Sequence, residues 1–222
     1  MTVIEYPKMR IHEIIVADDH AVVRVGLQLI LDETTDLAIM DEAENGQELL
    51  DKLRVRKYDL VILDISMPGT DAMEVLKEIR TCYPEMPVVI FSMNPGDVYA
   101  IRMLTGGASA YINKETNPDK IIEVLRTVLS GKKYYFPEHA EMMAEIIHHP
   151  ERRNVLLHET LTDREFQIFA LLASGVRKSE IALKLGISKS TVNNHRSSIL
   201  KKMNMSINPE LTKYAIQHRI IQ

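Results

Sequence analysis

The sequence predicts an α/β protein in which a doubly wound, five-stranded parallel sheet is followed by a small all-α helix-turn-helix domain. Two observations carry this prediction. Between residues 10 and 131, five apolar runs alternate with amphipathic segments, an alternation that is typical of βαβ units with right-handed crossovers. From residue 158 onward, short helical patterns follow one another instead. We therefore expect two domains, the number that 222 residues also favour.

The candidate strands are short apolar runs bounded by loop residues, as in strands buried on both faces of a sheet. They are Ile11–Ala17, Leu37–Ala43, Leu60–Asp64, Val88–Ser92 and Ala108–Ile112. Amphipathic helical patterns lie between and after them, at residues 20–32, 46–57, 71–82, 97–105 and 117–131. These elements make up a first domain over residues 10–131.

Residues 132–157 are predicted to be a linker that carries one helix. Pro137 suits the first turn of such a helix, and an apolar stripe runs along the residues that follow it. Pro150 would then end the helix.

The last domain, residues 158–222, has the pattern of a helix-turn-helix. Thr162 and Glu165 have the spacing of a capping box at the start of its first helix. The other helical patterns cover residues 178–185, 189–203 and about 209–220. The second and third helices are separated by a short turn that contains Gly186, as in DNA-binding helix-turn-helix units.

Charge is distributed unevenly between the two parts of the chain. Residues 1–150 contain 15 basic and 25 acidic residues, and residues 151–222 contain 12 and 6, which gives net charges of −10 and +6. This asymmetry predicts a regulatory or metal-binding module joined to a module that binds a polyanion.

Other bulk features favour a soluble protein of the cytoplasm. The N-terminus has no long apolar stretch, so a secretory signal is not expected. No segment has the apolar length that spans a bilayer, and we expect no membrane association. The single cysteine, Cys82, cannot form an internal disulfide, and no cysteine cluster predicts a structural zinc site.

Polar side chains follow four of the predicted strands. Asp18 and Asp19 follow the first strand, Asp64 the third, Ser92 the fourth and Lys114 the fifth. Ligands bind at the carboxyl ends of the strands in such sheets, so these groups should meet at one edge. Three carboxylates, a hydroxyl and an ammonium suit a divalent cation, most simply Mg²⁺, and a phosphoryl group. Asp64 is the candidate phosphoryl acceptor because it ends the central strand run.

The third helix of the last domain is the candidate recognition helix, with its apolar residues on one side and polar residues on the other. Asn193 and Asn194 are candidate base readers, because asparagine can bond adenine at two points. Further candidate DNA contacts, several of them to phosphate, are Lys189, Ser190, Thr191, Arg196, Ser197, Lys201 and Lys202.

The stretches ADDH, LDISMPGTD, FSM and YINK, in this order and spacing, resemble the flavodoxin-like receiver domain of two-component response regulators. This resemblance covers about residues 10–131. It implies that Asp64 is phosphorylated and that Asp18, Asp19 and the backbone carbonyl of Ser66 hold the metal together with Asp64. It also implies that Ser92 and Tyr111 form the switch pair and that Lys114 is the lysine of the site.

The stretch from LTDREF to ILKKM, within residues 158–222, is similar to the LuxR-type helix-turn-helix of the NarL/FixJ class. Two departures bear on the DNA sequence that it would bind. The run Arg177-Lys178-Ser179 stands where the family usually has a small residue, Asn and Lys, and Asn193 stands where it commonly has Lys. The resemblance also implies a dimer seam on the last helix, although the same apolar stripe suits an ordinary core.

Together these features predict a DNA-binding response regulator and not an enzyme, apart from self-directed phosphoryl transfer and autodephosphorylation. A cognate sensor histidine kinase would donate the phosphoryl group to Asp64 with Mg²⁺ present. The DNA partner would be double-stranded promoter DNA, bound by a homodimer when the protein is phosphorylated or on DNA.

Three other functions were weighed against this one. Aspartyl-phosphate hydrolases use a second carboxylate two residues after the nucleophile, where this chain has Ser66. A ligand-sensing DNA binder would need an apolar pocket, which the charged strand ends and the low aromatic content disfavour. A regulator that works without phosphate stays open, although all the site residues are present.

Overall fold

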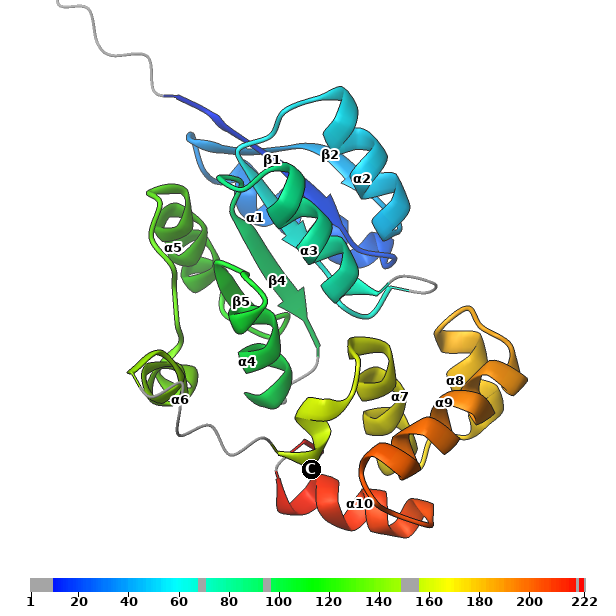
Figure 1. The fold of residues 1–222 in the computed structure, drawn as a ribbon. Helices are drawn as coiled ribbons and strands as arrows, with labels where there is room; N and C mark the ends of the chain where they lie inside the picture. The colour runs from blue at the N-terminus through cyan, green and yellow to red at the C-terminus, as the bar shows by residue number, and fades with distance from the viewer. Residues whose placement is uncertain (1–9, 68–70, 94–96, 149–155, 219, 222) are drawn as a thin grey trace, which may run out of the picture.

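The computed structural model of the protein describes residues 10–67, 71–93, 97–148, 156–218 and 220–221. The predicted helix stop at Pro150 lies outside these residues. Figure 1 shows the two parts of the chain, with the sheet and its helices above and the helices of the C-terminal part below.

The sheet has five parallel strands in the order β2-β1-β3-β4-β5, so the predicted architecture is confirmed. The strands are β1 His12–Ala17, β2 Leu37–Ala43, β3 Leu60–Leu63, β4 Val88–Ser92 and β5 Ala110–Asn113. The chain leaves β1 toward one edge of the sheet and returns through β3 toward the other. The carboxyl ends of β1 and β3 therefore flank the point where the strand order reverses, which is where such folds bind ligands.

Five helices cover the two faces of the sheet. Ile14 and Val16 of β1 face the cluster that includes residues of the first and fifth helices, whereas Ile15 and Ala17 face the other cluster. This alternation follows from the two-residue period of a strand, and burial on both faces explains why the strands are apolar throughout. The helices are α1 Ala21–Asp32, α2 Gly46–Val55, α3 Ala72–Cys82, α4 Asp97–Thr105 and α5 Pro118–Leu129.

The C-terminal part is helical, as the sequence predicts. Its elements are α6 Pro137–His148, the 3₁₀ helix η2 Leu157–Thr160, α7 Asp163–Ala173, α8 Lys178–Lys184, α9 Lys189–Lys202 and α10 Asn208–Gln217. The predicted capping box is present: Thr162 Oγ1 accepts from the Glu165 amide at 3.2 Å, and Glu165 accepts from the Thr162 amide at 2.8 Å. Gly186, with φ of +62°, makes the turn between α8 and α9 in a conformation that only glycine adopts easily.

The sheet domain and the C-terminal helices pack against each other through α4. Tyr99 lies edge-on to Phe166 of α7, with ring centroids 4.8 Å apart. The guanidinium of Arg102 lies over the same ring at 4.6 Å and donates to the carbonyl of Leu161 at 3.2 Å. One cluster of buried apolar residues runs through both parts of the molecule at this junction.

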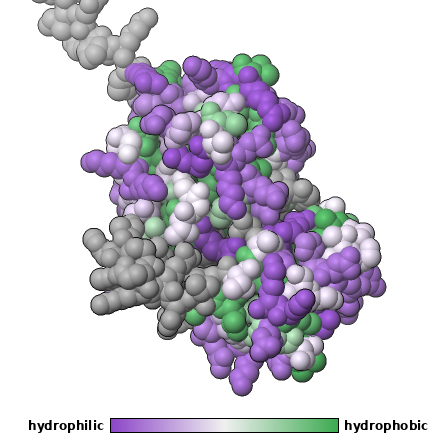
Figure 2. All heavy atoms as spheres, in the orientation of Figure 1, coloured by the Kyte–Doolittle hydropathy of each residue, from purple (hydrophilic) through white to green (hydrophobic). Residues whose placement is uncertain are grey.

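The face of the molecule seen in Figure 2 is mainly hydrophilic, with apolar side chains in small separate groups. None of the helices within the described residues is both long and apolar enough to cross a membrane.

Candidate functional site

Three carboxylates meet at the carboxyl edge of the sheet. Ala17 pairs with Leu63 in the parallel ladder, so the residues that follow them, Asp18 and Asp64, lie side by side. The Asp64 amide donates to the Ala17 carbonyl at 2.8 Å and holds this end of the ladder in register. One ligand atom from each of Asp18, Asp19, Asp64 and His20 lies within 4.8 Å of the others.

Lys114 reaches this cluster from the end of β5. Its Nζ lies 2.6 Å from Asp18 Oδ2 and 2.9 Å from Asp64 Oδ2, and only 6% of its side chain is exposed. Burial lowers the pKa of Lys114, but the bonds to the two carboxylates outweigh burial, and the pKa is raised overall. The ammonium is therefore held charged between Asp18 and Asp64. The structure thus brings together four residues that are up to 96 positions apart in the sequence.

Asp64 combines burial with a counter-charge. Its side chain is almost fully buried, and burial raises its pKa, although the hydrogen bond from Lys114 acts in the opposite direction. Its Oδ1 accepts from the Ser66 amide at 3.1 Å. The same turn that places Ser66 beside this carboxylate is the one that the resemblance associates with a metal ligand.

The oxygen-rich cluster fits a hard divalent cation. Its donors are carboxylate oxygens, which Mg²⁺ and Ca²⁺ prefer. Among the described residues, the buried oxygens Asp18 Oδ2 and Asp19 Oδ1 accept no well-aligned hydrogen bond. They lie instead within 3 Å of nitrogen atoms of Lys114 and His20. Each of these ion-paired oxygens keeps a further lone pair with which it can coordinate a cation.

Ser92 and Tyr111 are both buried next to this cluster, at the ends of β4 and β5. Burial raises the pKa of Tyr111, the Asp64 charge adds to this, and a side-chain hydrogen bond with Ser92 opposes it. The Tyr111 ring also lies edge-on to His139 of α6, with centroids 6.1 Å apart. A rearrangement of this pair would therefore reach the linker helix directly.

The cluster depends on an arginine that the sequence interpretation did not single out. Arg24 of α1 is buried and donates to the Asp18 carbonyl at 2.7 Å. It also donates to Glu42 at 2.5 Å and Glu44 at 3.3 Å, both near the end of β2. The only sequence signal for it is a charged residue within the mainly apolar first half of this helix. His20 is the N-cap residue of α1 but makes no side-chain cap bond, and its Nδ1 lies 2.9 Å from Asp19 Oδ1.

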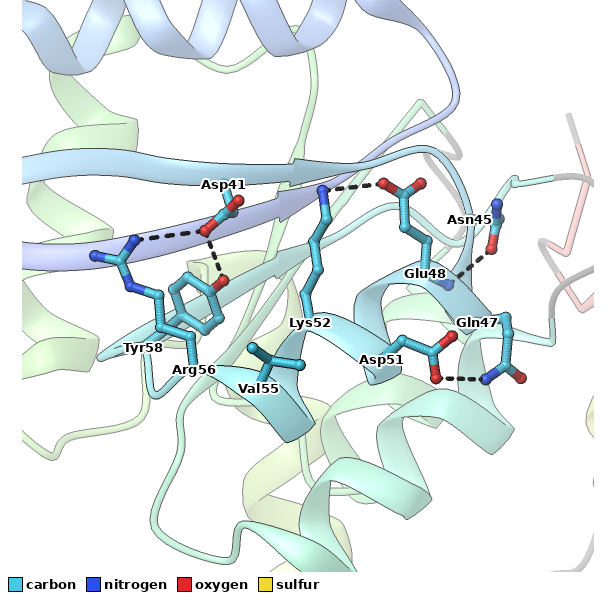
Figure 3. Close-up of a pocket in the computed structure, with 9 residues that line it drawn as sticks. All are labelled: Asp41, Asn45, Gln47, Glu48, Asp51, Lys52, Val55, Arg56 and Tyr58. Carbon is cyan, nitrogen blue, oxygen red and sulfur yellow. Dashed lines mark hydrogen bonds and ion pairs between the residues drawn. The ribbon is translucent and has the colours of Figure 1, made fainter.

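A separate hollow of about 600 Å³ lies beside α2 and the end of β2 (Figure 3). Several of its charged residues have partners: Asp41 accepts from the Tyr58 hydroxyl at 2.7 Å, and Lys52 pairs with Glu48 at 3.0 Å. Its lining includes none of the carboxylates of the cluster. The hollow in Figure 3 is therefore separate from the carboxylate cluster at the strand ends.

Ser188 caps the candidate recognition helix α9, because its hydroxyl accepts from the Thr191 amide at 3.0 Å. Val192, Ile199 and Leu200 are buried against the rest of the domain. The polar side is open to solvent: the exposed candidates are Lys189, Ser190, Asn194, Ser197, Lys201 and Lys202, and Thr191, Asn193 and Arg196 are half-buried.

Three of these candidates are bonded to side chains of other helices. Lys202 Nζ lies 2.6 Å from Glu165 Oε2, and Arg196 Nε donates to Asn208 Oδ1 at 2.6 Å. Asn193 Oδ1 accepts from Lys178 Nζ at 2.8 Å. The sequence interpretation did not foresee these bonds, because the partners come from three other helices.

The last helix divides between core and surface. Leu211, Tyr214 and Ala215 are buried, whereas Ile216 is 55% exposed. Part of the apolar stripe therefore belongs to the core, and Ile216 lies outside it. The helix ends at Gln217, three residues before the predicted end.

Comparison with known proteins agrees with both parts of the molecule. Residues 14–126 match the family described as "Response regulator receiver domain". Residues 159–215 match "Bacterial regulatory proteins, luxR family".

Several relatives are similar over nearly the whole chain. The oxygen regulatory protein NreC of Staphylococcus carnosus (strain TM300) is 32% identical over 214 residues, which cover 94% of this chain and 99% of NreC. The response regulator GacA of Pseudomonas viridiflava is 30% identical over 208 residues, which cover 94% and 97% of the two chains.

Solved structures show the same fold. The RcsB response regulator of Salmonella typhimurium superimposes with a TM-score of 0.68 over 95% of this chain and 100% of RcsB, at 23% identity. A LuxR-family two-component response regulator from Aurantimonas sp. SI85-9A1 gives a TM-score of 0.56 at 27% identity, over 61% and 96% of the two chains. The chain therefore belongs to the NarL/FixJ family of two-component response regulators, DNA-binding transcription regulators in which a receiver domain precedes a LuxR-type helix-turn-helix domain.

Proposed function

We propose that Asp64 accepts a phosphoryl group from a sensor histidine kinase and that this modification controls transcription through the C-terminal domain. One observation carries the proposal: a buried carboxylate lies 2.9 Å from a lysine ammonium and within the cluster formed with Asp18 and Asp19. A carboxylate acceptor, an oxygen-lined cation site and a fixed counter-charge are what phosphoryl transfer requires.

In the transfer, an oxygen of Asp64 attacks phosphorus, an O–P bond forms, and the bond from phosphorus to the donor histidine nitrogen breaks. Lys114 then exchanges its contact with Asp64 Oδ2 for a phosphoryl oxygen, and Asp18 keeps it in place. Asp18, Asp19, Asp64 and the Ser66 carbonyl would hold Mg²⁺, which when bound neutralises charge on the phosphoryl oxygens. The same site supports self-directed transfer from small phosphodonors and the slow hydrolysis of the acyl phosphate.

The signal then passes through Ser92 and Tyr111. The phosphoryl group adds about −1.5 to −2 charges at neutral pH, and Ser92 can donate to it. Ser92 would then leave its hydrogen bond with the Tyr111 hydroxyl. Tyr111 contacts His139 of the linker helix, so the modification acts on the segment between the domains. The domain limits that fit this role are 10–131, 132–157 and 158–222.

The target is double-stranded promoter DNA, bound through α9. Structures of RcsB from Salmonella enterica serovar Typhimurium include one bound to the rprA promoter in the presence of the phosphomimetic BeF3⁻. The exposed polar side of α9 and the charge of +6 on residues 151–222 support the same mode here. We assign base contacts to Asn193 and Asn194. The remaining contacts, chiefly to phosphate, fall to Lys189, Ser190, Thr191, Arg196, Ser197, Lys201 and Lys202.

We further propose a homodimer on DNA, paired through the exposed side of α10. Ile216 lies there beside a hollow of about 600 Å³ that is lined by residues of α7 and α10. A DNA partner supports the cytoplasm as the location of the protein.

The phosphoacceptor is tested by incubation with acetyl phosphate and Mg²⁺, followed by intact-mass measurement. The protein should gain the mass of one phosphoryl group, and Asp64→Asn should gain none. Asp51→Asn is the matched control, because Asp51 is an exposed carboxylate on α2. A phosphoryl group retained by D64N, or lost in D51N, would contradict the assignment of Asp64.

A further inference from the structure

The two helices of the helix-turn-helix are joined by one side-chain bond. Lys178, the first residue of α8, donates from Nζ to Asn193 Oδ1 at 2.8 Å. Asn193 is the fifth residue of α9, in the half of a recognition helix that reaches base edges. Lys178 belongs to one of the two departures from the family pattern, and Asn193 is the other. The two departures are therefore in direct contact.

The bond determines which end of the Asn193 side chain faces DNA. A lysine ammonium has only donors, so its partner must be the amide oxygen and not the amide nitrogen. The Oδ1 atom is therefore directed toward α8, and the Nδ2 group is the part left to meet a base.

This orientation disfavours the usual pairing of asparagine with adenine, because one lone pair of Oδ1 already accepts from Lys178. That pairing needs the amide oxygen to accept from adenine N6 while the amide nitrogen donates to N7. With Oδ1 bonded to Lys178 and directed toward α8, Asn193 presents mainly its N–H donors, and Lys178 beside it adds further donors. Guanine presents two acceptors, N7 and O6, on its major-groove edge, whereas adenine presents one acceptor and one donor.

We propose that Lys178 sets the base preference of Asn193, and that the pair selects guanine at a position where a free asparagine would select adenine. Lys178 is thus a specificity-determining residue that acts by orienting another side chain. This inference rests on the proposed binding of DNA through α9.

Lys178 has one competing role, a contact to a DNA phosphate. The two roles differ in their dependence on salt. Each phosphate contact contributes about −0.9 to the slope of log K against log salt concentration. An orienting lysine that stays bonded to Asn193 contributes much less to this slope, but it changes which base is preferred.

The experiment selects binding sites from randomised duplexes with the full-length protein. Asn193→Ala identifies the base pair that Asn193 reads, as the position at which preference is lost. The wild type should prefer guanine there, and Lys178→Met should shift the guanine-to-adenine ratio toward adenine by about tenfold. Lys178→Arg, which keeps a donor, should retain guanine.

Two controls make the result specific. Lys184→Met removes an exposed lysine at the other end of α8 and should change no base preference. In the Asn193→Ala background, Lys178→Met should have no further effect at that base pair, because the residue that it orients is gone.

Adenine as the wild-type preference at this base pair would overturn the proposal. An unchanged preference in K178M with a salt slope shallower by about one phosphate would overturn it as well and would assign Lys178 to the backbone. If the wild type does not bind DNA, or binds it independently of salt, the proposed DNA-binding function of α9 is refuted instead. This result differs from the two results that overturn only the role of Lys178. Circular dichroism of each variant, with Lys178→Ala as a second truncation, separates loss of folding from loss of preference.

Discussion

Replacing Lys114 by methionine is expected to destabilise the receiver core by about 3–5 kcal/mol in the absence of divalent cations. This is the cost of removing one partner from a buried ion pair, since the remaining charge stays buried without compensation. We expect this full cost of about 3–5 kcal/mol because Lys114 is within 3 Å of two carboxylates, Asp18 and Asp64. The side chains of both are at most 1% exposed. Without the ammonium, two adjacent negative charges face each other in the protein interior.

The deficit should depend on pH in a defined direction. Burial already raises the pKa of Asp64, and in the variant no ammonium opposes this rise. A carboxyl whose pKa is higher in the folded state stabilises that state below its unfolded pKa, and the stabilisation is lost as the pH rises through the folded pKa. The difference between K114M and wild type should therefore shrink as the pH is lowered from about 8 toward about 5. A divalent cation should shrink it too, by binding the folded state.

The measurement is native-state hydrogen exchange of the β1 and β3 amides, which reports opening of the receiver core separately from the C-terminal domain. Lys120→Met is the matched control, because Lys120 pairs with Glu123 on the surface of α5; such pairs are worth at most about 1 kcal/mol. If K114M and K120M open with the same free energy, the buried ammonium does not compensate the carboxylates, and the reasoning is refuted.

Two further predictions concern the C-terminal helices, and a third concerns their junction with α4. Burial raises the pKa of Glu165, but the bonds from Lys202 and from other donors outweigh burial and bring the pKa to about 2. Glu165→Gln should therefore lower the free energy of unfolding by about 2 kcal/mol near neutral pH. Urea unfolding should show this deficit shrink as the pH falls from 4.5 toward 2. A deficit independent of pH would contradict this account. Gly175→Ala should cost about 1–2 kcal/mol, because Gly175 has φ of +79°, whereas Gly26→Ala on α1 should be neutral or stabilising in the same assay. Arg102→Ala should speed exchange of the α7 amides by about fivefold or more, because the cation–π contact with Phe166 is worth about 1 kcal/mol; unchanged exchange would show that Arg102 does not hold the junction.

The strands of the sheet could be predicted from the sequence because they are buried on both faces. A strand in that environment is apolar at every position, and the run ends where the chain reaches the edge. Leu37–Ala43 and Val88–Ser92 were predicted to the residue. The last strand was predicted at Ala108–Ile112, whereas the structure has it at Ala110–Asn113. The meeting of Asp18, Asp64 and Lys114 followed from the parallel order of the strands.

Contacts between helices could not be predicted from the sequence. Periodicity shows which side of a helix is buried, but it does not show which helix packs against that side. Arg24 could be recognised only as a charged residue among apolar ones, and its role at the Asp18 carbonyl depends on how α1 sits over β2. The same holds for Lys178 and Asn193, which are 15 positions apart on two helices whose crossing fixes the bond. The junction at Arg102 also depends on tertiary packing alone.

The apolar cluster that continues from the receiver into the C-terminal helices has an energetic consequence. Any state in which the halves separate must expose Tyr99 and Phe166 to water, and solvation of one such ring costs about 1.5–3 kcal/mol. A ligand that opens the junction must therefore bind the separated form more tightly than the packed form. The difference in binding free energy must be at least the cost of solvating this ring. By linkage, a promoter that favours separation would raise the affinity of the receiver for its own opening ligand by the same factor.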